Sequence, residues 1–136
     1  MFSDEKIDEL AKVAALLIYA AKIDENFSNK EEKIIQKTML EIGANKENIE
    51  KIISLGKEME ANSNQILDFT KKVKNMNQQN KIMIIESLWK IIYSNKEADM
   101  YETNLMRRLS GLLYLDNKVV GDLKEKVIKK KNDISS

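Results

Sequence analysis

Oxygen-bearing side chains that could bind a metal ion are concentrated in one short stretch of the sequence, KIDENFSNKEEKII. Asp24, Asn26 and Ser28 stand at alternate positions, like the first, third and fifth ligands of a helix-loop-helix calcium loop. Glu31 and Glu32 follow closely and could supply a further carboxylate. Because Ca²⁺ and Mg²⁺ prefer oxygen ligands, one of these two divalent cations is the cofactor that such a site would use.

The same chemistry recurs in the second half of the chain. Asn95, Glu97 and Asp99 again stand at alternate positions, and Glu102 follows three residues later. A complete calcium loop is excluded, because its sharp turn needs a glycine and its closing ligand is a bidentate glutamate. In the two halves those positions carry other residues: Asn29, Ile35, Met100 and Met106. A weaker carboxylate site, closed by a glutamate of the following helix, is what remains of the metal hypothesis.

Helix capping explains the same residues without a metal ion. Ser28 with Glu31, and Asp99 with Glu102, have the spacing of a capping box. In this motif the first side chain accepts a hydrogen bond from a free helix amide, and the glutamate accepts one from the amide of the capping residue. Such a cap stabilises a helix by about 1 kcal/mol. We therefore favour capping over metal binding at both places.

The composition excludes several classes of enzyme. The 136 residues contain no cysteine and no histidine, so neither thiolate chemistry nor a Ser-His-Asp mechanism is available. A metal enzyme built on paired carboxylates is the remaining alternative. Metal enzymes in helical bundles place their ligands at inward-facing positions of central helices, whereas the glutamates described above stand at predicted helix starts. We therefore expect a protein that is not an enzyme.

The helices that must position these residues are readable from the apolar periodicity. Apolar residues recur at three- and four-residue steps, which predicts about seven helices and an all-α, single-domain bundle over residues 1–136. We expect a helix from Asp4 to Ile23, a second that ends at Gly43, a third capped by Asn45, a short fourth over Ile66 to Met76, a fifth from Lys81 to Tyr93, a sixth from Asp99 to Tyr114, and a last one capped by Asp116 or Asn117. The fifth is expected to be the buried centre, with the sole tryptophan, Trp89, filling the core.

The two halves of the chain resemble each other. Asp24 to Glu31 aligns with Asn95 to Glu102, and the apolar positions downstream stay in register. We therefore predict two pseudo-symmetric repeats, over about residues 4–60 and 64–131, that stack on one shared core. Residues 132–136 are expected to form a frayed tail.

Three segments carry a resemblance to a known family. LLIYAAKIDENFSNKEEKII, ILDFTKKV and IIESLWKIIYSNKEADMYETNLMRRLSGLLYL resemble the tellurite-resistance TerB family, in particular its short stand-alone members, and the amino-terminal domain of the DjlA co-chaperone. The resemblance extends from about Ile7 to Val127. In the family each half typically carries an Asp-Gly dipeptide, but here Glu25 replaces the first glycine, and Asn95 and Lys96 replace both residues in the second half.

The resemblance implies a helical bundle and a set of functions. Members of this family are associated with stress complexes at the cell envelope, where acidic residues serve metal binding or contacts with partners. The resemblance thus implies a binding module that contacts one or more partner proteins, in an oligomeric state that the sequence does not determine. The first ten residues, MFSDEKIDEL, are too polar for a secretory signal, and we expect a cytoplasmic location.

A basic cluster near the end of the chain offers an alternative partner. Five lysines there, Lys124, Lys126, Lys129, Lys130 and Lys131, could hold the protein at an anionic membrane surface. Cations near the end of a helix are also favoured by the helix dipole, and this simpler explanation is preferred. No aromatic residues are interleaved with these lysines, so nucleic acid is not expected as a partner.

Overall fold

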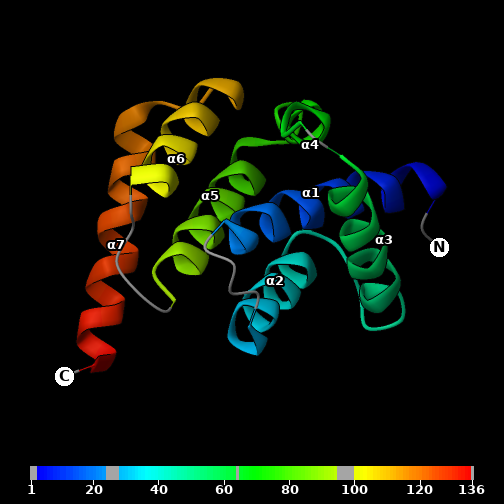
Figure 1. The fold of residues 1–136 in the computed structure, drawn as a ribbon, viewed down its shortest axis with the longest axis horizontal. Helices are drawn as coiled ribbons and strands as arrows, with labels where there is room; N and C mark the ends of the chain where they lie inside the picture. Colours follow the sequence, from blue (N-terminus) through cyan, green and yellow to red (C-terminus); the bar gives the residue numbers. More distant parts are fainter. Residues whose placement is uncertain (1–2, 24–27, 64, 95–99, 136) are drawn as a thin grey trace.

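The protein is a bundle of α-helices (Figure 1). The computed structural model describes residues 3–23, 28–63, 65–94 and 100–135. Within these ranges there are seven helices and no strand: α1 (Asp4–Lys22), α2 (Asn29–Glu41), α3 (Ile49–Asn62), α4 (Leu67–Val73), α5 (Gln78–Ile92), α6 (Met100–Leu112) and α7 (Asn117–Ser135). The predicted all-α bundle is therefore confirmed.

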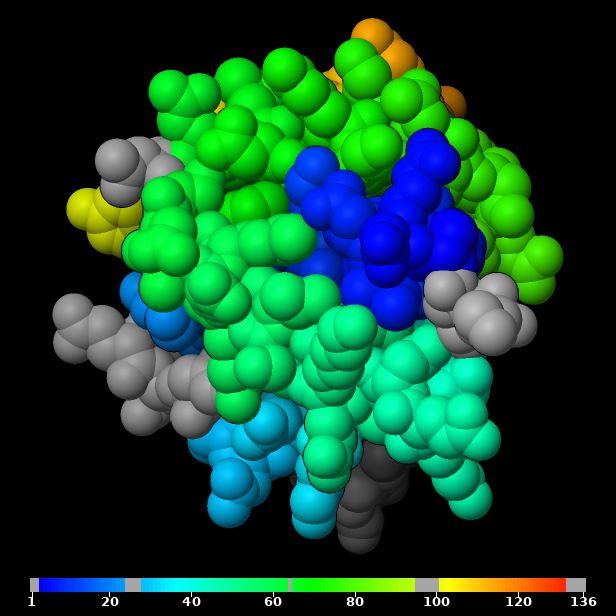
Figure 2. Space-filling model, turned by 90° about the vertical axis from the view of Figure 1, so that its right-hand side faces the viewer, coloured from blue at the N-terminus to red at the C-terminus, as the bar shows by residue number. Residues whose placement is uncertain are grey.

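Helix α1 has the largest number of buried residues in the described part of the chain. Ten of its 19 residues are buried, and it packs against α2, α3, α4 and α5 (Figure 1). In the view of Figure 2 the first turns of α1 reach the surface, where they are surrounded by residues of the following helices. We expected α5 to be the centre, and α5 does bury eight of its 15 residues. The small side chains of α1, five of them buried alanines, allow its neighbours to approach on several sides.

Helix α3 lies especially close to α1. Gly56 of α3 is buried, and a β-carbon built there would lie 2.8 Å from the Ala14 β-carbon. It would also lie 3.1 Å from two backbone atoms of α1, the Ala11 oxygen and the Ala15 nitrogen. Backbone atoms cannot move aside as a flexible side chain can. The absence of a side chain at Gly56 therefore sets the spacing of these two helices.

Helix α5 is joined to three other helices by side-chain hydrogen bonds. The Trp89 indole donates to the Val120 carbonyl of α7 (3.0 Å), and its side chain is buried, as expected. The buried Lys81 ammonium donates to the Leu113 carbonyl at the end of α6 (3.0 Å). Ser87 shares a hydrogen bond with Thr38 of α2. These bonds satisfy buried polar groups that would otherwise destabilise the core.

The ends of α2 and α6 have related geometry. Gly43 adopts a φ of 135°, and the Ala44 amide donates to the Met39 carbonyl (2.9 Å). After α6 the left-handed position is taken by Tyr114 with a φ of 56°, and the Leu115 amide donates to the Ser110 carbonyl (2.9 Å). The prediction that Gly43 ends α2 is thus confirmed.

Several predicted helix boundaries differ from the structure: α4 ends at Val73 and not at Met76, and α5 begins at Gln78 and not at Lys81. Asn45 caps a short turn, because its Oδ1 accepts from the amides of Glu47 and Asn48, and α3 begins only at Ile49. We expect a frayed tail from residue 132; fraying of this end stays a prediction, and the backbone of α7 is helical to Ser135. No proline or glycine follows Gly121 to interrupt it.

Helices α2 and α6 share features that two sequence repeats would produce. Helices α2 and α6 each have 13 residues, and each carries a glutamate as its third residue, Glu31 and Glu102. The pseudo-symmetry of the two halves in space stays a prediction. As to membranes, none of the helices in the described ranges is both long and apolar enough to cross a bilayer.

The contact between α1 and α3 makes a prediction about stability. Gly56→Ala should lower the free energy of unfolding, because overpacking costs about 1–3 kcal/mol and outweighs the gain of up to about 1 kcal/mol in helix propensity. Equilibrium urea denaturation followed by circular dichroism measures this change.

The matched control is Gly121→Ala in α7, where a β-carbon would meet no atom within 4 Å. There the propensity gain acts alone, so stability should rise by up to about 1 kcal/mol. Equal effects of the two substitutions would contradict the close approach of α1 and α3.

Candidate functional site

The first candidate metal junction is a capping box. Ser28 caps α2: its Oγ accepts from the Glu31 amide (3.5 Å), while Glu31 Oε1 accepts from the Ser28 amide (3.3 Å). The same carboxylate oxygen also accepts from the Ser28 hydroxyl (2.9 Å). Glu31 is only 1% exposed. The capping prediction is confirmed here, and the carboxylate is already engaged in the structure of the helix start.

Glu32 has a different role from Glu31. Its carboxylate accepts from the Lys57 ammonium of α3 at 3.1 Å, and both side chains are partly exposed. An ion pair of this exposure contributes up to about 1 kcal/mol and is screened by salt. Glu32 therefore joins α2 to α3 at the surface and does not add a ligand beside Glu31.

The second junction is described only from α6 onward. Glu102, the third residue of α6, is 1% exposed, as is its counterpart Glu31. The other predicted ligands lie outside the described residues: Asp24, Asn26, Asn95, Glu97 and Asp99. Across the part of the chain that is described, no three acidic residues come together in a group that could hold a metal ion. Metal binding at these junctions stays a prediction.

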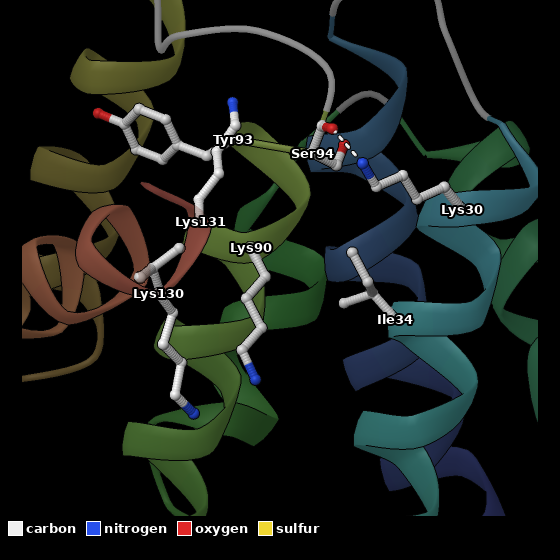
Figure 3. Close-up of a pocket in the computed structure, with 8 residues that line it drawn as sticks. Lys30, Ile34, Lys90, Tyr93, Ser94, Lys130 and Lys131 are labelled. Carbon is white, nitrogen blue, oxygen red and sulfur yellow. Dashed lines mark hydrogen bonds between the residues drawn. The ribbon is translucent and has the colours of Figure 1, made fainter. Parts of the chain in front are cut away.

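A cleft of about 420 Å³ lies between α2, α5 and α7. Eight described residues line it, and we call it the lysine cleft because half of them are lysines: Lys30, Ile34, Lys90, Tyr93, Ser94, Val127, Lys130 and Lys131. Figure 3 shows these side chains arranged around the opening. Its volume is in the range of small-ligand pockets, about 300–1,000 Å³.

The inner wall of the lysine cleft is apolar. Ile34 comes from α2, Val127 from α7, and Tyr93 from the end of α5. Val127 and Tyr93 are 5% and 9% exposed, so their side chains belong mostly to the core. Ile34 is half-buried. A ligand in this cleft would therefore meet hydrocarbon at its centre.

The cleft's lysines are held in different ways. The Lys30 ammonium donates to the Ser94 carbonyl at the end of α5 (2.7 Å). The Lys131 ammonium lies 6.0 Å from the centroid of the Tyr93 ring, within the range of a cation-π contact. Lys90 has a carboxylate partner, since its ammonium is 3.7 Å from Glu86. Lys130 is exposed.

The charge of the lysine cleft is strongly positive. None of the described residues that line it is acidic. The Glu86 carboxylate contacts the Lys90 ammonium and also lies 3.4 Å from the Lys126 ammonium of α7. Its single negative charge therefore offsets only part of the positive charge of these two lysines. A cleft lined by one sign of charge concentrates the field and attracts ligands of the opposite sign. The arrangement therefore favours anionic groups.

The chemistry of the lining points to binding. The Ser94 hydroxyl donates to the Ile91 carbonyl (2.7 Å), whereas an activated nucleophile would donate to a neighbouring base. The remaining polar groups of the described lining are ammonium groups and the Tyr93 phenol. Such a set can hold and orient an anion.

Sequence reasoning found half of the cleft's lysines. Of the predicted basic cluster, Lys130 and Lys131 line the cleft, while Lys124 lies over the Trp89 ring (5.7 Å). Lys30 and Lys90 were missed, because no neighbouring residue in the sequence marks either lysine as part of a site. Only the packing of α2 and α7 on either side of α5 brings them to one place.

Comparison with known proteins identifies one relationship. The family model described as "Tellurite resistance protein TerB" matches residues 10–125 of the chain. The match includes α2 to α6 in full, most of α1 and the first part of α7. Comparisons with curated proteins and with solved structures give no match.

The capping box makes a prediction that separates it from a metal site. Ser28→Ala should lower the free energy of unfolding by about 1 kcal/mol, because it removes the cap of α2. The loss should be the same in calcium chloride as in chelator, as measured by urea denaturation under both conditions.

Ser54→Ala is the control, because Ser54 is exposed within α3. Alanine has the higher helix propensity, so this substitution should not lower stability. A wild-type free energy of unfolding that rises with the logarithm of the calcium concentration, with no such rise in Ser28→Ala, would instead indicate an ion bound at the junction.

Proposed function

The chain belongs to the TerB family, and from this premise we propose that it is a non-enzymatic binding module that contacts a partner protein in a stress-response or envelope-associated complex. The lysine cleft is the surface through which we propose that it acts. The partner would present acidic side chains to Lys30, Lys90, Lys130 and Lys131.

The observation that carries this proposal is the combination of charge and shape in the cleft. Four lysines surround an apolar wall, and the described lining has no carboxylate of its own. Complementary charge speeds association with an acidic partner and disfavours basic ones. The apolar wall adds affinity by excluding water from the ligand's hydrocarbon parts.

The same features weigh against nucleic acid as the partner. Proteins that bind single strands offer exposed aromatic rings on which bases stack. Among the described residues that line the lysine cleft the aromatic one is Tyr93, which is 9% exposed and lies beneath the Lys131 ammonium. The described lining therefore offers a base no open ring surface, and a partner with flexible acidic side chains fits better.

Photo-crosslinking in cells tests the proposed function. A benzophenone amino acid at position 129, which is exposed beside Lys130 on α7, should form a covalent adduct with a partner protein on irradiation. The adduct should be lost when Lys90→Gln and Lys130→Glu are introduced into the same chain. The first substitution removes a positive charge that attracts an acidic partner, and the second adds a negative charge that repels it.

Two controls make the result specific. Lys46→Gln with Lys51→Glu changes the net charge equally at exposed positions outside the cleft, and the adduct should persist. The same crosslinker at position 51 of α3 should not form it. Adducts that survive the changes at Lys90 and Lys130 in a folded protein would refute the proposed role of the cleft.

A further inference from the structure

The positive charges of the lysine cleft are spread along it. Figure 3 shows the ammonium groups of Lys90 and Lys130 extending toward one end of the cleft. The ammonium groups of Lys30 and Lys131 lie toward the other end, near Ser94 and Tyr93. The cleft thus has two cationic ends.

A compact anion such as phosphate suits this arrangement poorly. Proteins usually hold phosphate by donors that converge on one point, such as helix amino-terminal amides or the fork of an arginine. Here Lys30 already donates to a backbone carbonyl (2.7 Å), and Lys131 lies over a ring. The lining described for this cleft includes no arginine. Separated carboxylates match separated ammonium groups better.

The middle of the cleft is apolar. Ile34 lies between the two cationic ends in Figure 3, and Val127 also lines the cleft. A purely acidic ligand would leave this wall in contact with water or with its own charged groups. An aliphatic side chain placed between acidic ones would cover it.

We propose that the lysine cleft binds a short protein segment in which acidic residues flank one or two aliphatic residues. This inference rests on the proposed function and specifies the chemistry of the partner. The acidic side chains pair with the lysines at the two ends, and the aliphatic side chains contact Ile34 and Val127. The volume of about 420 Å³ has room for a few side chains and not for a folded element.

Synthetic peptides test this pattern directly. The probe is a fluorescein-labelled peptide, Gly-Glu-Glu-Leu-Leu-Glu-Glu-Gly, whose binding to the full chain is measured by fluorescence anisotropy. A second signal is the fluorescence emission of Trp89, the sole tryptophan. The centroid of its ring lies 6.1 Å from the centroid of the Tyr93 ring, and Tyr93 lines the cleft. We expect saturable binding that weakens as salt is added.

Two altered peptides separate the contributions of charge and of the apolar wall. Replacing the leucines by serine, or the glutamates by glutamine, should each weaken binding by about tenfold or more, because each removes one of the two contacts. Lys90→Gln with Lys130→Glu should weaken binding of the original peptide to a similar extent. The pair Lys46→Gln with Lys51→Glu should leave it unchanged.

Other outcomes would overturn the inference. If the peptide with serine in place of leucine bound as tightly as the original peptide, the cleft would recognise charge alone. Inorganic phosphate or phosphatidylglycerol vesicles that bind through Lys90 and Lys130, where the peptide does not, would assign the cleft to phosphate or to a lipid surface. Failure of the peptide while the crosslink at position 129 persists and depends on these lysines would refute the segment chemistry but leave the proposed function standing.

Discussion

The close packing of α3 against α1 is the contact on which the arrangement of the first half depends. A β-carbon at Gly56 would lie closer to the Ala14 β-carbon and to the α1 backbone than normal van der Waals contact allows. The two helices therefore lie as near to each other as their backbones permit. With α1 held in this way, its remaining buried faces are covered by α2, α4 and α5. A helix that is apolar nearly all round is stable in water only when it is enclosed like this.

Helix α5 connects the helices of the first half to those of the second half. Its side chains form hydrogen bonds with α2 through Ser87, with α7 through Trp89, and with the end of α6 through Lys81. Because these bonds are directional, they determine where α2 and α7 lie on the two sides of α5. The lysine cleft is the space that results between the three helices, so its shape follows from contacts in the core.

The acidic loop junctions show how one residue pattern can serve two purposes. An oxygen side chain followed three residues later by a glutamate can contribute ligands to a divalent cation, and the same pair can form the capping box that begins a helix. At Ser28 and Glu31 the structure uses them to begin a helix, with Glu31 buried and bonded to the capping residue. At the second junction the predicted cap, Asp99, lies outside the described residues, so the choice between capping and metal binding there stays a prediction.

The sequence by itself determined the helices and the family of this protein. Helical periodicity, the glycine that ends α2 and the capping box of α2 are local features, since they depend on residues within a few positions of one another. The exact helix boundaries and the contacts of α1 with four other helices were less accessible, because tertiary packing contributes to each. The lysine cleft was decided by the tertiary structure: Lys30, Lys90 and Lys130 come from three helices far apart in the chain. Each of these lysines is unremarkable on its own helix, and they form a site because core packing places the three helices side by side.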